Sequence, residues 1–122
     1  MASRHRGYDG RDYTSGDYTV PIARIDAQQI QAFLNAHPHW REVGGKLHCE
    51  FRFSSFVQAF GFMTQSALIA ERADHHPEWF NVYNLVVVDL VTHDASGISQ
   101  RDIDMACAME TIAASMVQSA TP

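Results

Sequence analysis

Polar and apolar residues alternate along the segment 46–53 in a strict two-residue pattern. The apolar positions of this pattern are Leu47, Cys49, Phe51 and Phe53. Alternation with one polar face is typical of a strand in an antiparallel sheet that is covered on one side. Gly44 and Gly45 separate the segment from a shorter extended stretch at 40–43, so the sequence predicts a β-hairpin over these residues.

Two further segments show the 3.6-residue period of amphipathic helices. The first covers residues 26–37, with Asp26 as its N-cap, and ends there because Pro38 disfavours the helical conformation in the preceding residue. The second covers residues 54–74 and begins with two serines that can cap it. Its expected core-facing stripe consists of Phe56, Phe60, Met63, Ala67 and Ala70.

A second hairpin is predicted over residues 79–92, where aromatic residues and valine are concentrated, with its turn near Asn84, a residue that tolerates positive φ. The box Ser99-x-x-Asp102 then opens a last helix that runs to about Gln118. The element order is therefore α-β-β-α-β-β-α. This order predicts a single α+β domain, a four-stranded antiparallel sheet with its helices packed on one face.

The last helix is apolar around most of its circumference. One apolar stripe consists of Met105, Met109, Ile112 and Met116, and another of Ile103, Ala106, Ala113 and Val117. A helix that lies on one sheet should have a broader polar face, so we expect a second copy of the chain to cover part of this surface, in a homodimer or homotetramer. The alternative is that the helix lies deeper in the core of its own chain.

Length and composition indicate a single folded domain with a tail and without membrane-spanning or secretory segments. A length of 122 residues suits one domain. Residues 1–20 have no periodic pattern and are rich in Gly, Asp, Arg and Tyr, so we expect a disordered tail before a folded domain at 21–122. The sequence contains no apolar run of membrane-spanning length, no secretory signal pattern and no CxxC motif, so a cytoplasmic location is expected, with a nuclear one also open for a eukaryotic protein.

The net charge of −5 is unevenly spread, since four of the nine basic residues lie in the first 25 positions. The folded part is therefore strongly acidic, and it would repel a phosphate backbone. We expect no direct nucleic-acid binding.

Three histidines are placed unlike the other four. His75 and His76 stand where the long helix gives way to Pro77, and His93 follows the last strand. The hairpin between them brings both places to one end of the sheet, whichever residues form its turn. Glu71 lies one helical turn before His75, where a carboxylate would fix the tautomer of the imidazole.

Several imidazoles beside a carboxylate suit proton transfer, because one ring can donate a proton while another accepts one, as the elimination of water requires. Two alternatives stay open. Three histidines and a glutamate also make a zinc or iron ligand set, although the HExxH pattern is missing and adjacent histidines diverge. His75 and His76 can also serve only as helix caps. Asp102 is explained as a capping carboxylate, and Trp79 as a core or interface residue.

These residues belong to a longer motif pattern, Glu71-Arg-Ala-Asp-His75-His76-Pro77-Glu-Trp79-Phe-Asn81-Val-Tyr83-Asn84, then Thr92-His93-Asp94 and Gly97-Ile-Ser-Gln-Arg-Asp102. The pattern resembles the pterin-4a-carbinolamine dehydratases over about residues 40–118. The resemblance implies a hydro-lyase that converts 4a-hydroxytetrahydropterin to quinonoid dihydropterin without metal or cofactor. This reaction recycles the pterin cofactor of aromatic amino acid hydroxylases.

The resemblance also implies residue roles and partners. The site residues carried over by position are His75, His76 and His93, supported by Glu71 and Asp102. His75 and His93 are expected to be the acid/base pair, and His76 to bind the pterin together with Asp74 and Trp79. The family further implies a dimer or a dimer of dimers. Its animal members also stabilise a homeodomain transcription factor as a dimerisation cofactor, through helices, and this is the alternative function.

Overall fold

A computed structural model describes residues 22–119 of the protein, so the tail expected at 1–20 lies outside the described residues. The elements are α1 (Ala27–Ala36), β1 (Arg41–Val43), β2 (Lys46–Arg52), α2 (Phe56–Ala73), β3 (Glu78–Val82), β4 (Leu85–Leu90), the 3-10 turn η2 (His93–Ala95) and α3 (Gln100–Ser119). This is the predicted order and the predicted α+β fold. Within the described part of the chain, no helix combines the length and the apolar character needed to cross a membrane.

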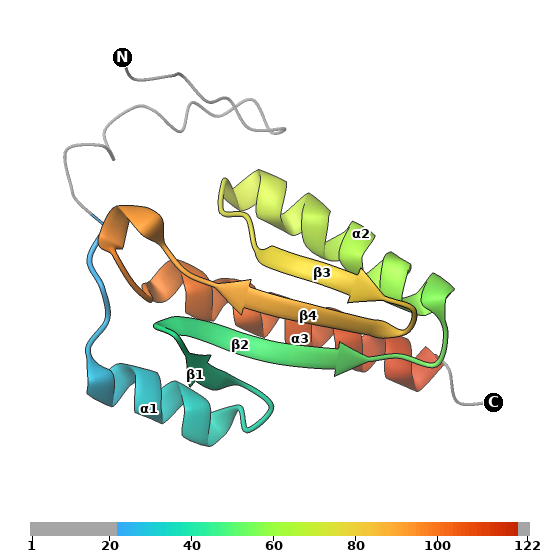
Figure 1. The fold of residues 1–122 in the computed structure, drawn as a ribbon, viewed down its shortest axis with the longest axis horizontal. Coiled ribbons are helices and arrows are strands. Elements are labelled where there is room, and N and C mark those ends of the chain that lie inside the picture. Colours follow the sequence, from blue (N-terminus) through green and yellow to red (C-terminus); the bar gives the residue numbers. More distant parts are fainter. Residues whose placement is uncertain (1–21, 120–122) are drawn as a thin grey trace, which may run out of the picture.

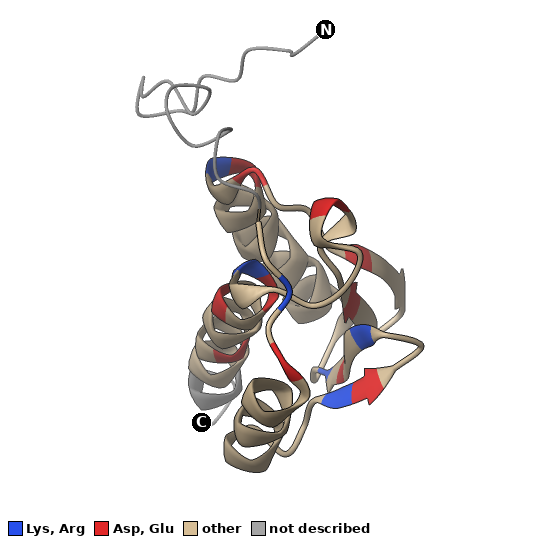
Figure 2. Ribbon diagram, turned by 90° about the vertical axis from the view of Figure 1, so that its left-hand side faces the viewer, with Lys and Arg blue, Asp and Glu red and all other residues tan. Residues whose placement is uncertain are grey.

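The four strands form one antiparallel sheet in the order β1-β2-β4-β3. Figure 1 shows β3 on the side of the sheet nearer α2, and β1 on the side nearer α1. Figure 2, turned by 90°, shows the three helices on one side of the sheet, with acidic positions spread over helices, strands and connections. The opposite face of the sheet carries no helix of the described chain.

The core lies between this sheet and the helices. Every second residue of β2 is buried, as the alternation predicts, and so are Val86, Val88 and Leu90 of β4. The ring of Phe62 on α2 packs between two phenylalanines of the β2 segment, with ring centroids 4.7 Å from Phe51 and 5.0 Å from Phe53. Each such buried side chain contributes about 1.5–3 kcal/mol relative to an exposed one.

Both hairpin turns have two residues. Gly44 and Gly45 have φ values of +59° and +77°, which explains glycine at both positions. In the second turn Val82 pairs with Leu85, so the turn is Tyr83-Asn84. The positive φ falls on Tyr83 and not on Asn84, whose side chain donates a hydrogen bond to the Phe53 carbonyl.

The buried face of α2 differs from the expected one. Its buried residues are Ala59, Phe62, Ser66 and Ala70. Phe56 and Phe60 are 49% and 56% exposed, and Ala67 is also exposed. Only Ala70, and Met63 in part, follow the prediction. The helix is apolar on two adjacent faces, and a helical period locates such faces without showing which one meets the sheet.

The expectation that a second chain covers part of the apolar surface of α3 does not hold for its methionine stripe. Met105, Met109 and Ile112 are buried within one chain, and Met116 packs against the same core. The deeper burial weighed as the alternative is what the structure shows. α3 contacts both α2 and β4, so two of its sides are covered by its own chain. The Val117 side chain lies outside the described part.

Candidate active site

The end of α2 decides where the two adjacent histidines point. Asp74 adopts a left-handed conformation at φ 50°, and the backbone N–H of His75 donates to the Ala70 carbonyl. This Schellman-type end reverses the chain and lets Pro77 follow. As a result the His75 side chain is buried while that of His76 is more than half exposed. The expected divergence of the two rings is confirmed.

His75 forms a hydrogen bond with a carboxylate that is itself fully buried. The His75 Nε2 lies 2.6 Å from the Oδ1 of Asp102, which is 27 residues further along the chain. Asp102 sits in the first turn of α3 and has no exposed surface. A buried carboxylate destabilises the fold unless its oxygens accept hydrogen bonds. The other partners of Asp102 therefore show whether it is the acceptor in the contact with His75.

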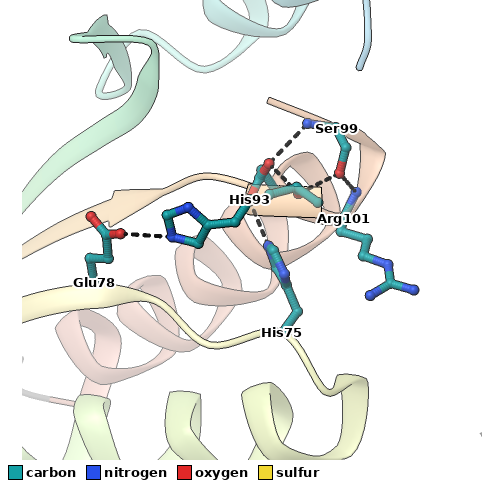
Figure 3. A network of polar contacts seen from close by, with 7 residues as sticks. His75, Glu78, His93, Ser99 and Arg101 are labelled. Carbon is teal, nitrogen blue, oxygen red and sulfur yellow. Dashed lines mark hydrogen bonds and ion pairs between the residues drawn. The ribbon is translucent and has the colours of Figure 1, made fainter. Parts of the chain in front are cut away.

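The other oxygen of Asp102 accepts two hydrogen bonds. Its Oδ2 takes one from the hydroxyl of Thr92 at 2.8 Å and one from the backbone N–H of Ser99 at 2.9 Å. Because the Thr92 hydroxyl donates to Asp102, the Ser99 hydroxyl must be the donor in the 2.6 Å contact between the two hydroxyls. The Ser99 oxygen in turn accepts from the backbone N–H of Arg101. Figure 3 shows this network around Ser99.

This arrangement assigns the proton of the His75 ring. Both oxygens of Asp102 act as acceptors, so Nε2 of His75 carries the proton and donates it. In the neutral ring Nδ1 then holds the free electron pair. A carboxylate that orients an imidazole through one nitrogen leaves the other ready to accept a proton, and it stabilises the imidazolium that results. Asp102 is therefore both the expected helix cap and the partner of His75.

The spacing of Glu71 predicts a contact with His75, and this prediction is wrong. Glu71 forms a hydrogen bond with His76. Their Oε1 and Nε2 atoms are 2.8 Å apart, and both side chains are more than half exposed. The one-turn spacing fails because α2 ends at Ala73, two residues before His75. An exposed pair of this kind contributes about 0–1 kcal/mol.

His93 lies at the same corner but in another environment. It begins η2, its side chain is 79% exposed, and its Nε2 is 3.2 Å from the Oε2 of Glu78 on β3. Figure 3 shows its ring turned toward Glu78 and away from His75, which lies below it in this view. Thr92, the residue before His93, donates to Asp102, so one buried carboxylate connects the backbone at His93 with the ring of His75.

A cavity of about 190 Å³ opens beside His75, between α2 and α3. Its other lining residues are Ile69, Ala73, Arg101, Asp104 and Met105. A larger groove of about 460 Å³ lies between the end of α1, β2 and α3, and none of the three histidines lines it. Of the two further residues expected to bind substrate, Asp74 caps α2 and Trp79 is half-buried against the core.

Sequence reasoning missed Glu78, Thr92, Arg101 and Asp104. Arg101 shares the first turn of α3 with Asp102 and Asp104 follows two residues later, and this closeness is the signal that could have drawn attention to them. Each of the three histidines has its own carboxylate. Over residues 22–119, no three or more His, Cys, Asp or Glu side chains are grouped so that they could hold a metal ion.

Comparison with known proteins extends the similarity seen in the motifs. A family model described as pterin 4 alpha carbinolamine dehydratase matches residues 23–112. A relative from Novosphingobium aromaticivorans, assigned the same activity by name, is 54% identical over 94 residues, 75% of this chain and 98% of its own length. One from Solibacter usitatus, with the same assigned name, is 48% identical over 91 residues, 75% of this chain and 96% of its own length.

A solved structure is also similar. The crystal structure of a transcriptional coactivator/pterin dehydratase from Brucella melitensis matches with a TM-score of 0.71 and 46% sequence identity, and the match covers 74% of this chain and 98% of that one. The family model alone spans well over half of the chain. The chain therefore belongs to the pterin 4 alpha carbinolamine dehydratase family.

Proposed function

We propose that this protein dehydrates 4a-hydroxytetrahydropterin to quinonoid dihydropterin and water by histidine acid/base catalysis, and so recycles the pterin of aromatic amino acid hydroxylases. Family membership supports the reaction class. The observation that carries the mechanism is His75, whose ring is oriented by a fully buried carboxylate next to a cavity. A cytoplasmic location remains a prediction from the sequence.

The reaction needs one proton donor and one proton acceptor. The C4a–O bond breaks and the hydroxyl leaves as water after it receives a proton. The lone pair of N5 forms the C4a=N5 bond, and N5 then loses its proton. Two imidazoles of different environment can fill these roles near neutral pH.

The hydrogen bonds favour one division of these roles. His75 presents Nδ1 as a proton acceptor, because its Nε2–H donates a hydrogen bond to Asp102. We therefore assign the base to His75 and the acid to His93. His76, exposed beside Glu71, would bind the pterin ring.

The test is to follow quinonoid dihydropterin formation from freshly generated 4a-carbinolamine, with and without the protein. Activity should persist after exhaustive chelation. Loss of activity on chelation, restored by added zinc, would instead support the metal site left open by the sequence. No acceleration over the uncatalysed reaction would refute the proposed function.

The proposed homodimer or homotetramer needs another surface, since the α3 stripe is buried. One chain leaves apolar side chains exposed along α2 and on β3, an edge strand of the sheet. They are Phe56, Val57, Phe60 and Leu68 on α2, and Phe80 and Val82 on β3. An uncovered edge strand can pair with its own copy about a twofold axis, so we place the contact along β3 and the exposed apolar side of α2. Phe60→Glu should yield smaller species in sedimentation, whereas Met109→Glu should unfold the chain.

The alternative function is that of a stabilising partner of a transcription factor. It draws support from the similar Brucella melitensis protein, which is described as a transcriptional coactivator as well as a pterin dehydratase. The exposed apolar surface of α2 would then serve that partner. Near-normal turnover in variants of both His75 and His93 would favour this function over the enzyme.

A further inference from the structure

Glu78 lies on the open face of the sheet, where its carboxylate contacts two different side chains. One of its oxygens, Oε2, lies 3.2 Å from the Nε2 of His93, and the other, Oε1, contacts the ammonium group of Lys46. Glu78 is the first residue of β3, and Lys46 is the first residue of β2. β4 lies between these two strands, so the lysine side chain reaches across β4 to meet the carboxylate.

Each oxygen of Glu78 thus faces a different donor. The ring of His93 is otherwise largely in solvent, at 79% exposed, on a three-residue turn. An exposed imidazole on a short turn populates several rotamers unless a partner selects one. Glu78 supplies that partner from a strand whose backbone is fixed by pairing with β4.

We propose that Glu78 is a positioning residue for His93, and that Lys46 tunes how strongly the Glu78 carboxylate acts on that ring. The role of His93 in catalysis rests on the proposed function, while its coupling to Glu78 and Lys46 does not. Glu78 donates no proton to substrate. It holds one rotamer and one tautomer of His93, with Nε2–H directed at the carboxylate and Nδ1 left for the reaction.

The charges at this corner support the assignment. The hydrogen bond with Lys46, and more weakly the one with His93, lowers the pKa of Glu78, so the carboxylate is ionised at neutral pH. The same hydrogen bond raises the pKa of Lys46, with Asp89 on β4 contributing. Other charged or titratable groups toward this end of the sheet include His48 on β2 with its partners Asp89 and Glu50, Asp94 on η2, and the buried His75 and Asp102.

The two partners of Glu78 predict opposite effects on His93. Glu78→Gln keeps the shape and removes the negative charge, so the His93 ring loses the strong acceptor that selects its rotamer and its Nε2–H tautomer. Lys46→Met removes the donor that competes for the same carboxylate, so Glu78 should hold the ring more firmly. In the double variant the effect of Lys46→Met should shrink, because the lysine acts largely through Glu78.

The experiment measures the tautomer ratio and the rotamer of the neutral His93 ring by NMR in the full chain and in these variants, with Glu42→Gln on β1 as the charge-matched control. The signals are assigned by their loss in His93→Ala. An unchanged tautomer ratio in Glu78→Gln, or changes in the same direction in both single variants, would overturn the coupling. Thermal melting checks that each variant is folded.

Turnover then tests the link to catalysis. Glu78→Gln should lower kcat about 3–10-fold with little change in KM, whereas Glu42→Gln should change neither. An unchanged kcat, despite an altered tautomer ratio of the His93 ring, would overturn the positioning role. A wild-type protein without dehydratase activity would refute the proposed function, while the NMR measurement would still decide the coupling.

Discussion

His75 and His76 are neighbours in the sequence, yet each forms a hydrogen bond with a different carboxylate in a different environment. The first pair, with Asp102, is buried and joined to Thr92 and Ser99. The second, with Glu71, is more than half exposed on both sides. A buried pair interacts through a low dielectric and keeps one geometry, whereas solvent and salt weaken an exposed pair.

The difference indicates separate tasks. A residue that moves a proton at a defined atom needs a fixed ring, and burial beside Asp102 provides one. A residue that helps to bind a flat heteroaromatic ring must remain accessible, and His76 does. Only the buried pair should contribute strongly to both stability and activity.

The largest effect is expected for Asp102→Asn. The amide replaces an acceptor oxygen with an NH₂ group that must face one of the donors of Asp102, and it removes the charge that stabilises the His75 imidazolium. We expect kcat to fall about 10²–10⁴-fold and the free energy of unfolding to fall by about 2–4 kcal/mol. Steady-state kinetics and denaturant unfolding measure both. Normal values for both would remove the distinction between the two pairs.

His75→Gln tests the ring without disturbing its partner. The glutamine amide can still donate to Asp102, so the fold should persist, but it cannot carry a proton. We expect a rate loss of about 10²–10⁴-fold with a melting temperature near that of the wild type. His75→Ala should be less stable than His75→Gln, because it leaves the buried carboxylate without one of its donors. Equal stability of the two variants would contradict this interpretation of the buried pair.

The exposed pair should give a smaller and different change. His76→Ala should raise KM several-fold with kcat nearly unchanged, since uniform binding energy is lost. Glu71→Gln should change the free energy of unfolding by less than about 1 kcal/mol. A fall of kcat as large as that for His75→Gln would place His76 in the proton transfer itself.

The smallest expected effect is on the pH dependence of stability. It comes from His48, another histidine paired with carboxylates, on the open face of the sheet. Burial lowers its pKa, but hydrogen bonds with Asp89 and Glu50 outweigh burial, so the net pKa is raised above 6.5. A raised histidine pKa stabilises the folded chain fully below the unfolded value, and this contribution is lost as pH rises through the folded value. His48→Gln should flatten the fall in melting temperature above pH 6.5. An identical pH dependence in both proteins would show that this contact contributes nothing.

The local elements follow from short-range patterns in the sequence. The two-residue alternation at 46–53, Gly44-Gly45 and the Ser99-x-x-Asp102 box each produced the predicted strand, turn and helix start. These signals depend on residues a few positions apart, whose geometry the backbone fixes. The convergence of His75, His76 and His93 on one corner also followed from the order of the elements.

Which side chains meet depends on the packing of distant elements. The face of α2 that packs on the sheet, the pairing of Glu71 with His76, and the contact between His75 and Asp102 across 27 residues were not readable from spacing. The helix cap of Asp102 was predicted and its second role was not, because the local pattern already explained the residue. A periodic pattern reports that a face is apolar or a turn is capped. Which distant side chain completes a buried hydrogen bond depends on how the α2 end, the β4–α3 loop and the first turn of α3 are packed together.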